Sequence, residues 1–185
     1  MSLTPSSAVK ELLDPDEILQ QEFEYARETA LQANNDRTQV VNLYVILVGG
    51  LGSLALGLPS LALDIRWLAA LLGVVGVLGV FNVLKLIRLR QAWHDSVLAM
   101  NRIKDFYLVH YPEMAPAFRW RTETLPPPGK LGTITFDLTV LVALIDSLAV
   151  GAAAYLAGVP GWGAAVAATA FGALQLGLYF RLLRR

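Results

Sequence analysis

Two long apolar blocks, residues 40–89 and 134–183, dominate the chain, and polar residues make up most of the rest. Each block holds two runs with few or no charged side chains, at residues 40–58 and 67–84, then 134–157 and 162–180. A bilayer core of about 30 Å needs about 20 residues of α-helix. The runs do not alternate as the strands of a membrane barrel do. They therefore predict four transmembrane helices, with spans at about 39–62, 66–86, 133–157 and 161–181.

The links within each block, residues 63–66 and 158–161, are only four residues long and suit tight helical hairpins. A soluble bundle would need a polar face on every helix, and these runs have none. The predicted fold is an all-α polytopic membrane protein with two transmembrane hairpins and two cytoplasmic amphipathic helices. Its predicted regions are 1–37 (cytoplasmic), 38–86 (first hairpin), 87–131 (cytoplasmic helix and Pro-rich loop) and 132–185 (second hairpin with a short basic tail).

The basic residues are distributed very unequally around these spans. Fourteen of the 15 Lys and Arg residues lie before the first span, in the long central segment or in the tail, and Arg66 alone lies elsewhere. Short loops rich in Lys and Arg stay on the cytoplasmic side. We therefore expect a multi-pass protein of the cell (inner or plasma) membrane, with both termini in the cytoplasm. Tyr44, Phe136 and Tyr179 are expected in the aromatic belt at the cytoplasmic interface.

The polar regions predict two further helices. Asp14 and Pro15 are typical of a helix start, and this helix is expected to end near Ala33, before a break at residues 34–36. The second helix continues from the second span to about His110. Because the two carry opposite charge bias, we expect them to pack together, although the basic one could instead lie on anionic headgroups. Residues 15–33 and 86–110 are also a possible surface for a cytosolic protein partner.

Composition and motifs argue against an enzyme. The chain has no cysteine and no net charge, which excludes thiolate chemistry and gives no field that would attract nucleic acid. His94 and His110 have no second metal-type ligand at useful spacing, and the glycine clusters lie inside the apolar runs. We predict no catalytic residue, no metal and no cofactor. The pattern at Arg119, Trp120 and Arg121 predicts a membrane-surface anchor instead.

Four polar residues lie at similar depth, one to two turns inside the cytoplasmic end of each span. They predict an interior layer of hydrogen bonds between the helices. The alternative is the mouth of a polar pathway through the bundle. The four residues, one on each helix, are Asn42, Asn82, Asp137 and Gln175.

Asp146 lies deeper, near the middle of the third span. An ionised carboxylate there costs about 2.5–3.5 kcal/mol even on a lenient insertion scale, so it should face the bundle interior. Ser53 is a possible partner at the same depth, and no Lys, Arg or His lies within the spans to neutralise the charge. Asp146 is therefore either protonated and donating a hydrogen bond, or hydrated in a cavity that moves ions or protons. Asp137 is nine residues away, on the opposite side of the helix.

Small residues recur at four-residue spacing in the first, third and fourth spans. Such residues let helices approach closely, either within one chain or between copies. The candidates are Gly49, Ser53, Gly57, Ser147, Gly151, Gly172 and Gly177.

Three functions fit this layout. The leading expectation is a homo-oligomeric pore, channel or membrane-perturbing protein, with the cytosolic helices used for assembly or gating. The alternatives are a small ion- or proton-coupled transporter that uses Asp146, and a membrane scaffold or accessory subunit. The layout is loosely similar to small bacterial membrane effectors of the SLATT type, which place membrane helices beside cytosolic ones. Those proteins have one hairpin, whereas this chain has two.

Overall fold

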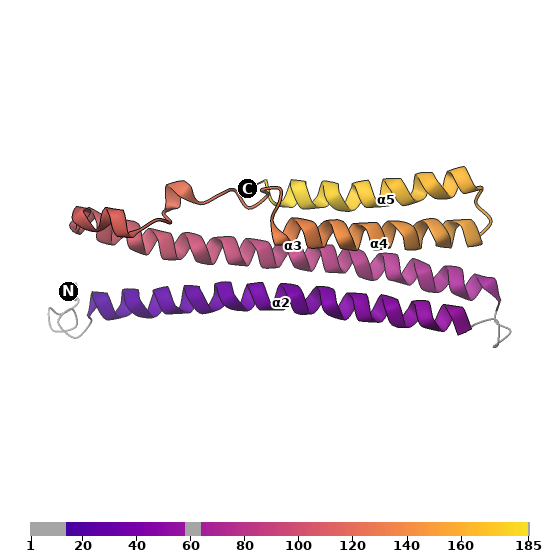
Figure 1. The fold of residues 1–185 in the computed structure, drawn as a ribbon, viewed down its shortest axis with the longest axis horizontal. Helices are drawn as coiled ribbons and strands as arrows, with labels where there is room; N and C mark the ends of the chain where they lie inside the picture. Colours follow the sequence, from indigo (N-terminus) through magenta and orange to yellow (C-terminus); the bar gives the residue numbers. More distant parts are fainter. Residues whose placement is uncertain (1–13, 58–63, 185) are drawn as a thin grey trace, which may run out of the picture. The chain divides into compact units, whose positions relative to one another are not determined.

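The computed structural model describes residues 14–57 and 64–184, with side-chain surroundings described as far as residue 54 in the first segment. Four long helices make up most of this part of the chain (Figure 1). They are α2 (Pro15–Gly57), α3 (Ile65–His110), α4 (Ile134–Leu156) and α5 (Gly161–Leu182). Two short 3-10 helices, η2 (Pro112–Ala117) and η3 (Thr122–Thr124), lie between α3 and α4. The described residues contain no strand, and the all-α prediction is confirmed.

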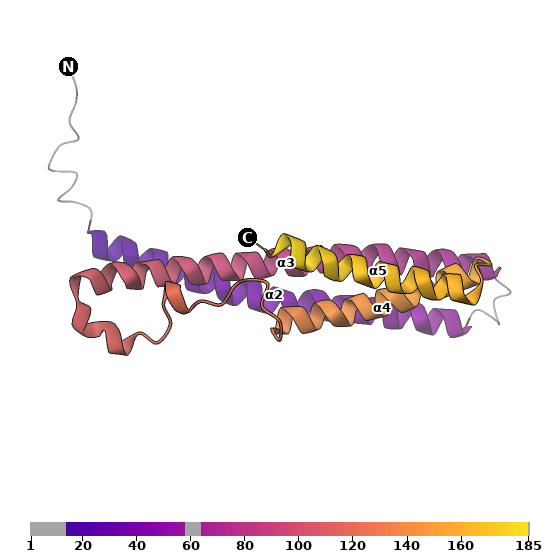
Figure 2. The same cartoon turned by 90° about the horizontal axis from the view of Figure 1, so that it is seen from above.

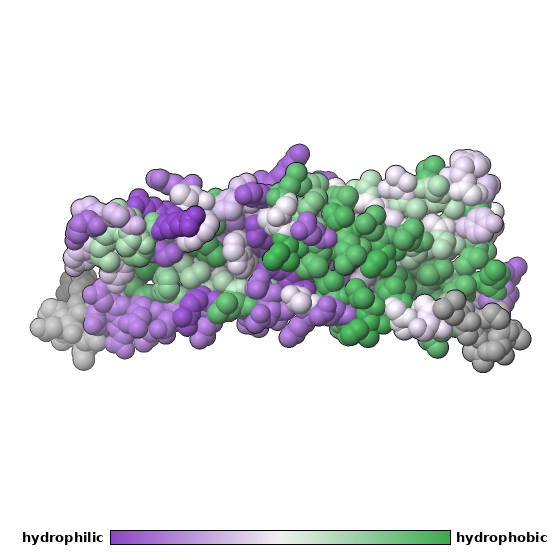
Figure 3. Space-filling view, in the orientation of Figure 1, coloured by the Kyte–Doolittle hydropathy of each residue, from purple (hydrophilic) through white to green (hydrophobic). Residues whose placement is uncertain are grey.

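Three of these helices, α3, α4 and α5, are long and apolar enough to cross a membrane. Apolar side chains cover the visible faces of α4 and α5, whereas hydrophilic side chains cover the first turns of α2 (Figure 3). The length and composition of these helices are consistent with a location in a membrane. The remaining predicted span, at about 39–62, begins in the second half of α2, and its last residues, 58–62, lie outside the described part of the chain.

Helix α2 begins as the sequence predicts, because the Asp14 carboxylate accepts a hydrogen bond of 3.0 Å from the Asp16 N–H and Pro15 is the first helical residue. The predicted break at residues 34–36 is wrong, since α2 continues through it. Asn residues disfavour helices when their side chains compete for backbone groups. Here the Asn34 side chain accepts a hydrogen bond from Arg37 on the next turn, which leaves the backbone ladder intact.

Helices α4 and α5 run antiparallel and side by side (Figures 1 and 2). The Thr133 hydroxyl caps α4 by accepting from the Phe136 N–H at 3.2 Å. The turn between the helices needs Gly158, whose φ of +94° suits a residue without a side chain. Close packing follows at Gly151, where an added Cβ would lie 2.9 Å from the Cβ of Ala168.

The chain divides into two compact units. Unit 1 comprises residues 1–32 and 92–126, and unit 2 comprises residues 33–91 and 127–185. Unit 1 carries six Lys and Arg against eleven Asp and Glu, whereas unit 2 carries nine against four. The zero net charge of the whole chain is thus the sum of an acidic unit and a basic unit.

Within unit 1, the first turns of α2 pack against the last turns of α3. The Tyr107 hydroxyl donates a hydrogen bond of 3.1 Å to Asp16, and this bond raises the pKa of Tyr107. The Lys104 ammonium lies 6.0 Å from the centre of the Phe23 ring. The two predicted polar helices therefore contact each other inside one unit. The following loop is held by Arg121, which donates to the Ala115 carbonyl at 2.7 Å.

The continuity of α2 can be tested at Asn35, whose side chain is exposed. Asn35→Ala should raise stability by about 0.5 kcal/mol, because Ala is the better helix former, and Asn35→Pro should cost about 3 kcal/mol. Thermal unfolding of the purified protein, followed by circular dichroism, measures both changes. Equal stability of the two variants would mean that residues 34–36 are not helical.

Candidate functional site

Asp146 on α4 lies at the centre of unit 2 and is fully buried. The Tyr44 hydroxyl of α2 donates a hydrogen bond to its Oδ1. The Gln175 Nε2 of α5 donates to its Oδ2 at 2.6 Å. Each carboxyl oxygen thus has one donor, and the donors come from two different helices. An intramembrane carboxyl that bonds two neighbouring helices ties the bundle together at its middle.

Helix α3 lies against the fourth side of this site, and the residue that faces the carboxyl there is a glycine, Gly79. A Cβ at Gly79 would overlap the Asp146 carboxyl, so only glycine leaves room for it. One turn earlier, a Cβ at Gly76 would lie 2.7 Å from Cγ2 of Val150 on α4. The two glycines allow the α3 backbone to approach α4 closely, and the carboxyl occupies the space that they leave.

The pocket can accommodate the carboxyl in either protonation state. An ionised Asp146 accepts from Tyr44 and Gln175, as the assigned hydrogen bonds show. The Gln175 Oε1 has no hydrogen-bond partner among the described residues. A rotation of this amide by about 180° would turn Oε1 toward the carboxyl. A protonated Asp146 could then donate to it, so one pair of side chains serves both states.

Further buried polar groups lie toward one end of unit 2, here called the basic end and defined by Arg37, Arg88, Arg90 and Arg181. Tyr179 is one turn beyond Gln175 on α5, is fully buried, and its hydroxyl has no hydrogen-bond partner among the described residues. Asn82 is one turn beyond Gly79 on α3 and has an equally unpartnered Oδ1. Buried polar atoms without protein partners are typical of sites that hold water.

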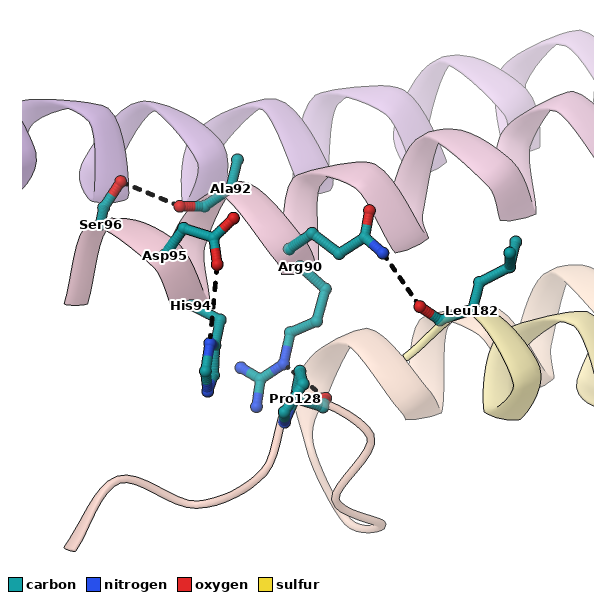
Figure 4. A network of polar contacts seen from close by, with 8 residues as sticks. Arg90, Ala92, His94, Asp95, Ser96, Pro128 and Leu182 are labelled. Carbon is teal, nitrogen blue, oxygen red and sulfur yellow. Dashed lines mark hydrogen bonds and ion pairs between the residues drawn. The ribbon is translucent and has the colours of Figure 1, made fainter. Parts of the chain in front are cut away.

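Two buried arginines lie at the basic end itself. Arg37 of α2 donates to the Thr135 hydroxyl at 2.6 Å. Arg90 of α3 donates to the Pro128 carbonyl at 3.0 Å, as Figure 4 shows. Both side chains are about 5% exposed. Burial lowers the pKa of Arg37, and the positive charge of Arg90 lowers it further.

The opposite half of unit 2 is apolar. A cavity of about 300 Å³ lies there, and it is lined by aliphatic side chains and small residues. Its lining residues include Val48, Leu51, Leu72, Val75, Ile145 and Ala149. The polar interior of unit 2 therefore runs from the basic end to Asp146, and beyond Asp146 the interior is apolar.

The structure does not bring all the predicted polar residues together. The predicted pairing of Ser53 with Asp146 is wrong, because Ser53 is exposed and donates to its own Gly49 carbonyl at 2.9 Å. Asn42 and Asp137 are also exposed, so the four-residue interior layer does not form within the chain. Of its members, Gln175 is fully buried and binds Asp146 instead.

The small residues fall into two groups. Ser147 of α4 lies against Gly172 of α5, where a Cβ added to Gly172 would overlap the Ser147 hydroxyl. Gly151 of α4 also packs against α5. Gly49 and Gly177 have no described neighbour within 4 Å of an added Cβ. Gly57 is the last residue of α2, and its surroundings lie outside the described side chains.

Sequence reasoning missed Tyr44 and Tyr179 as interior groups, because tyrosine near a span end usually belongs to the aromatic belt. Both are buried, and the belt prediction for them is wrong. A periodicity signal was present: Arg37, Val41 and Tyr44 follow a 3–4 spacing and are all buried. The role of Gly79 had no comparable signal, since it depends on which helix faces it.

Outside this site the candidate residues make local contacts. The His110 Nδ1 lies 3.0 Å from its own helix carbonyl at Phe106, and the His94 Nδ1 lies 3.9 Å from Asp95. No group of three His, Asp or Glu residues in residues 14–57 and 64–184 is placed to hold a metal ion. The Arg119 guanidinium lies 5.8 Å from the Trp120 ring centre, and the membrane-surface role of this pair stays a prediction.

The space left by Gly79 can be tested with a matched pair of variants. Gly79→Ala places a methyl group against the carboxyl and should destabilise the protein by about 1–3 kcal/mol, as overpacking does. Gly73→Ala, on the same helix with open space around it, should be neutral or stabilising by up to about 1 kcal/mol. Thermal unfolding in detergent compares them. Equal effects of the two substitutions would contradict the placement of Asp146 against α3.

Searches of protein-family models, of curated proteins and of solved structures were made with the whole chain. None of the three returned a match.

Proposed function

We propose that this chain is a small, non-enzymatic, proton-coupled transporter of the cell membrane, with Asp146 as the group that takes up and releases the proton. The observation that supports it best is the position of Asp146, which is fully buried, bonded from two helices and located where the polar interior of unit 2 ends. Ionisable residues within membrane helices are costly and commonly serve as proton or ion sites. No cofactor or catalytic group is needed for this role.

Two features favour a proton over a metal ion as the bound species. Asp146 offers a single carboxylate, whereas Na⁺ or a divalent cation would require several oxygen ligands around it. The other polar groups that reach it are a hydroxyl and an amide nitrogen, and both act as donors. Donors repel a cation but accommodate a carboxyl that gains or loses a proton.

The buried polar groups suggest how a proton reaches this carboxyl. The unpartnered atoms of Tyr179, Asn82 and Gln175 lie between Asp146 and the basic end, and water bound to them would form a hydrogen-bonded path. On the other side the interior is apolar and resists protons. In a transporter, this arrangement would give Asp146 access to protons from the basic end, and the apolar cavity of about 300 Å³ leaves room for the helices to repack when access switches.

The topology that goes with this function has four spans, including one in the second half of α2. Residues 40–57 of α2 contain no charged side chain. Because short basic segments remain in the cytoplasm, the basic end is assigned to the cytoplasmic side, and both termini lie there.

Single-cysteine labelling tests the topology directly, since the natural chain has no cysteine. Gly161→Cys lies at the exposed first residue of α5, and Arg184→Cys lies just past the end of α5. A membrane-impermeant maleimide added to intact cells should label Gly161→Cys and label Arg184→Cys only after the cells are opened. The reverse pattern, or labelling of both residues in intact cells, would refute the assignment.

Asp146→Asn tests the proton site, because asparagine keeps the size and the acceptor oxygen of the side chain but cannot titrate. In reconstituted membranes, wild-type protein should show an infrared carboxyl band that changes with pH, and the variant should lack it. Proton flux into liposomes along a pH gradient, followed with a trapped dye, should fall at least tenfold.

Asp137→Asn is the matched control, since the same substitution is made on the exposed side of the same helix. It should leave both the infrared band and the flux unchanged. An unaltered band and flux in Asp146→Asn would instead make the Asp146 hydrogen bonds purely structural.

A homo-oligomeric pore is the second candidate, and the exposed polar residues of the spans favour it. Asn42 and Asp137 lie on the outside of unit 2, where contact with a second copy would satisfy polar groups that lipid cannot. A pore of this kind predicts an oligomer in mild detergent and a passive conductance that depends on Asp137 rather than Asp146. Protein binding through residues 15–33 and 86–110, as in a scaffold, would leave no flux of either kind.

A further inference from the structure

A second pocket lies on the outside of unit 2 between α3 and α5, at the basic end. Its volume is about 380 Å³. Arg88 and Gln91 contribute from α3, and Arg181 contributes from the last turn of α5. The remaining lining is aliphatic, from Leu84, Ile87 and Leu182. The pocket thus combines two guanidinium groups with an apolar wall.

In the described part of the chain, the two arginines of this pocket have no carboxylate partner. Neither Arg88 nor Arg181 forms an ion pair within the described residues. Unit 2 contains only four acidic residues, Asp36, Asp64, Asp137 and Asp146, and none of them lines the pocket. Two like charges that share a pocket repel each other, and an anion between them removes that repulsion. The charge of the pocket therefore suits an anionic ligand.

The end of α5 does not neutralise these arginines by itself. Its last carbonyl groups carry only a partial negative charge. One of them, the Leu182 carbonyl, already accepts a hydrogen bond of 3.0 Å from the Gln91 side chain (Figure 4). This bond also fixes α3 to α5, so the two helices that carry the arginines are held together without a ligand.

The position of the pocket identifies the kind of anion. On α3 the apolar run of the span ends at Lys85, one turn before Arg88, and on α5 it ends at Arg181. Both guanidinium groups therefore lie at the depth of lipid headgroups, and the partly exposed side chain of Leu84 lies one turn before Arg88, toward the apolar part of the span. Basic pockets between transmembrane helices at this depth bind anionic headgroups. A guanidinium group commonly binds a phosphate through two parallel N–H···O hydrogen bonds.

We propose that the pocket between α3 and α5 is a binding site for the phosphate group of an anionic phospholipid, held by Arg88 and Arg181 with its acyl chains along Leu84. The site is separate from Asp146, which lies inside the bundle, and the proposal does not depend on the transport function. A lipid bound here would bridge α3 and α5 on their outer side, as Gln91 does at Leu182.

Native mass spectrometry of the protein in mild detergent can test this site. With phosphatidylglycerol added, the wild-type protein should retain at least one lipid that phosphatidylcholine does not replace. Arg88→Gln/Arg181→Gln should weaken this retention about tenfold or more, given the contribution of each basic residue at a membrane surface. Arg88→Lys/Arg181→Lys keeps the charge and should retain most of the binding.

The control variant is Arg27→Gln/Arg102→Gln, which removes the same charge from exposed positions of unit 1. It should bind phosphatidylglycerol like wild type. An equal loss in both Gln double variants, or retention of phosphatidylcholine as strongly as phosphatidylglycerol, would overturn the proposal. Should Arg88→Gln/Arg181→Gln fail to fold, Arg181→Gln alone is compared with Arg27→Gln in the same assay.

Inorganic phosphate and glycerol phosphate, added as competitors, identify the source of the phosphate group. No displacement of phosphatidylglycerol by either compound is the expected result, because the acyl chains contribute to the contact. Displacement at millimolar concentration would overturn the lipid assignment and leave a pocket for soluble phosphates.

Discussion

The requirement that a fully buried carboxyl must have hydrogen-bond partners governs unit 2. Asp146 cannot reach water through the apolar half of the bundle, so its two oxygens are satisfied by Tyr44 and Gln175. These partners determine which faces of α2 and α5 point inward, and Gly79 determines how closely α3 approaches. One side chain thus constrains all four helices of the unit.

Much of the fold could be predicted from the sequence, because the bilayer imposes simple rules on length and polarity. The bounds of α4 and α5 agree with the predicted spans to within one residue. The continuity of α2 at residues 34–36 could not be predicted in this way, because the local helix propensity of these residues favours a break. In the structure the Asn34 side chain binds Arg37 and so does not compete for backbone hydrogen bonds. Propensity describes a residue in isolation, and the contact depends on the neighbouring turn.

The candidate site was predictable only in part. Depth within the span identified Asp146, because a carboxyl there is costly wherever the helices lie. Its partners were not identifiable by depth, since the long side chains of Tyr44 and Gln175 reach it from levels closer to the basic end. Ser53 matched in depth but lies on an exposed face of α2. Which of these residues faces Asp146 depends on the rotation of each helix about its axis. The sequence constrains this rotation only weakly in an apolar run.

The glycine at the centre of the bundle also limits how α3 can slide along α4. A movement by one residue, about 1.5 Å along the axis with a rotation of about 100°, would bring Leu78 or Val80 against the carboxyl, and neither side chain fits in a space that excludes even a methyl group. A movement by three residues, about 4.5 Å along the axis with a rotation of about 60° in the opposite sense, would bring Gly76 there instead. The spacing of Gly76 and Gly79 therefore favours discrete positions of α3 against α4 over continuous sliding.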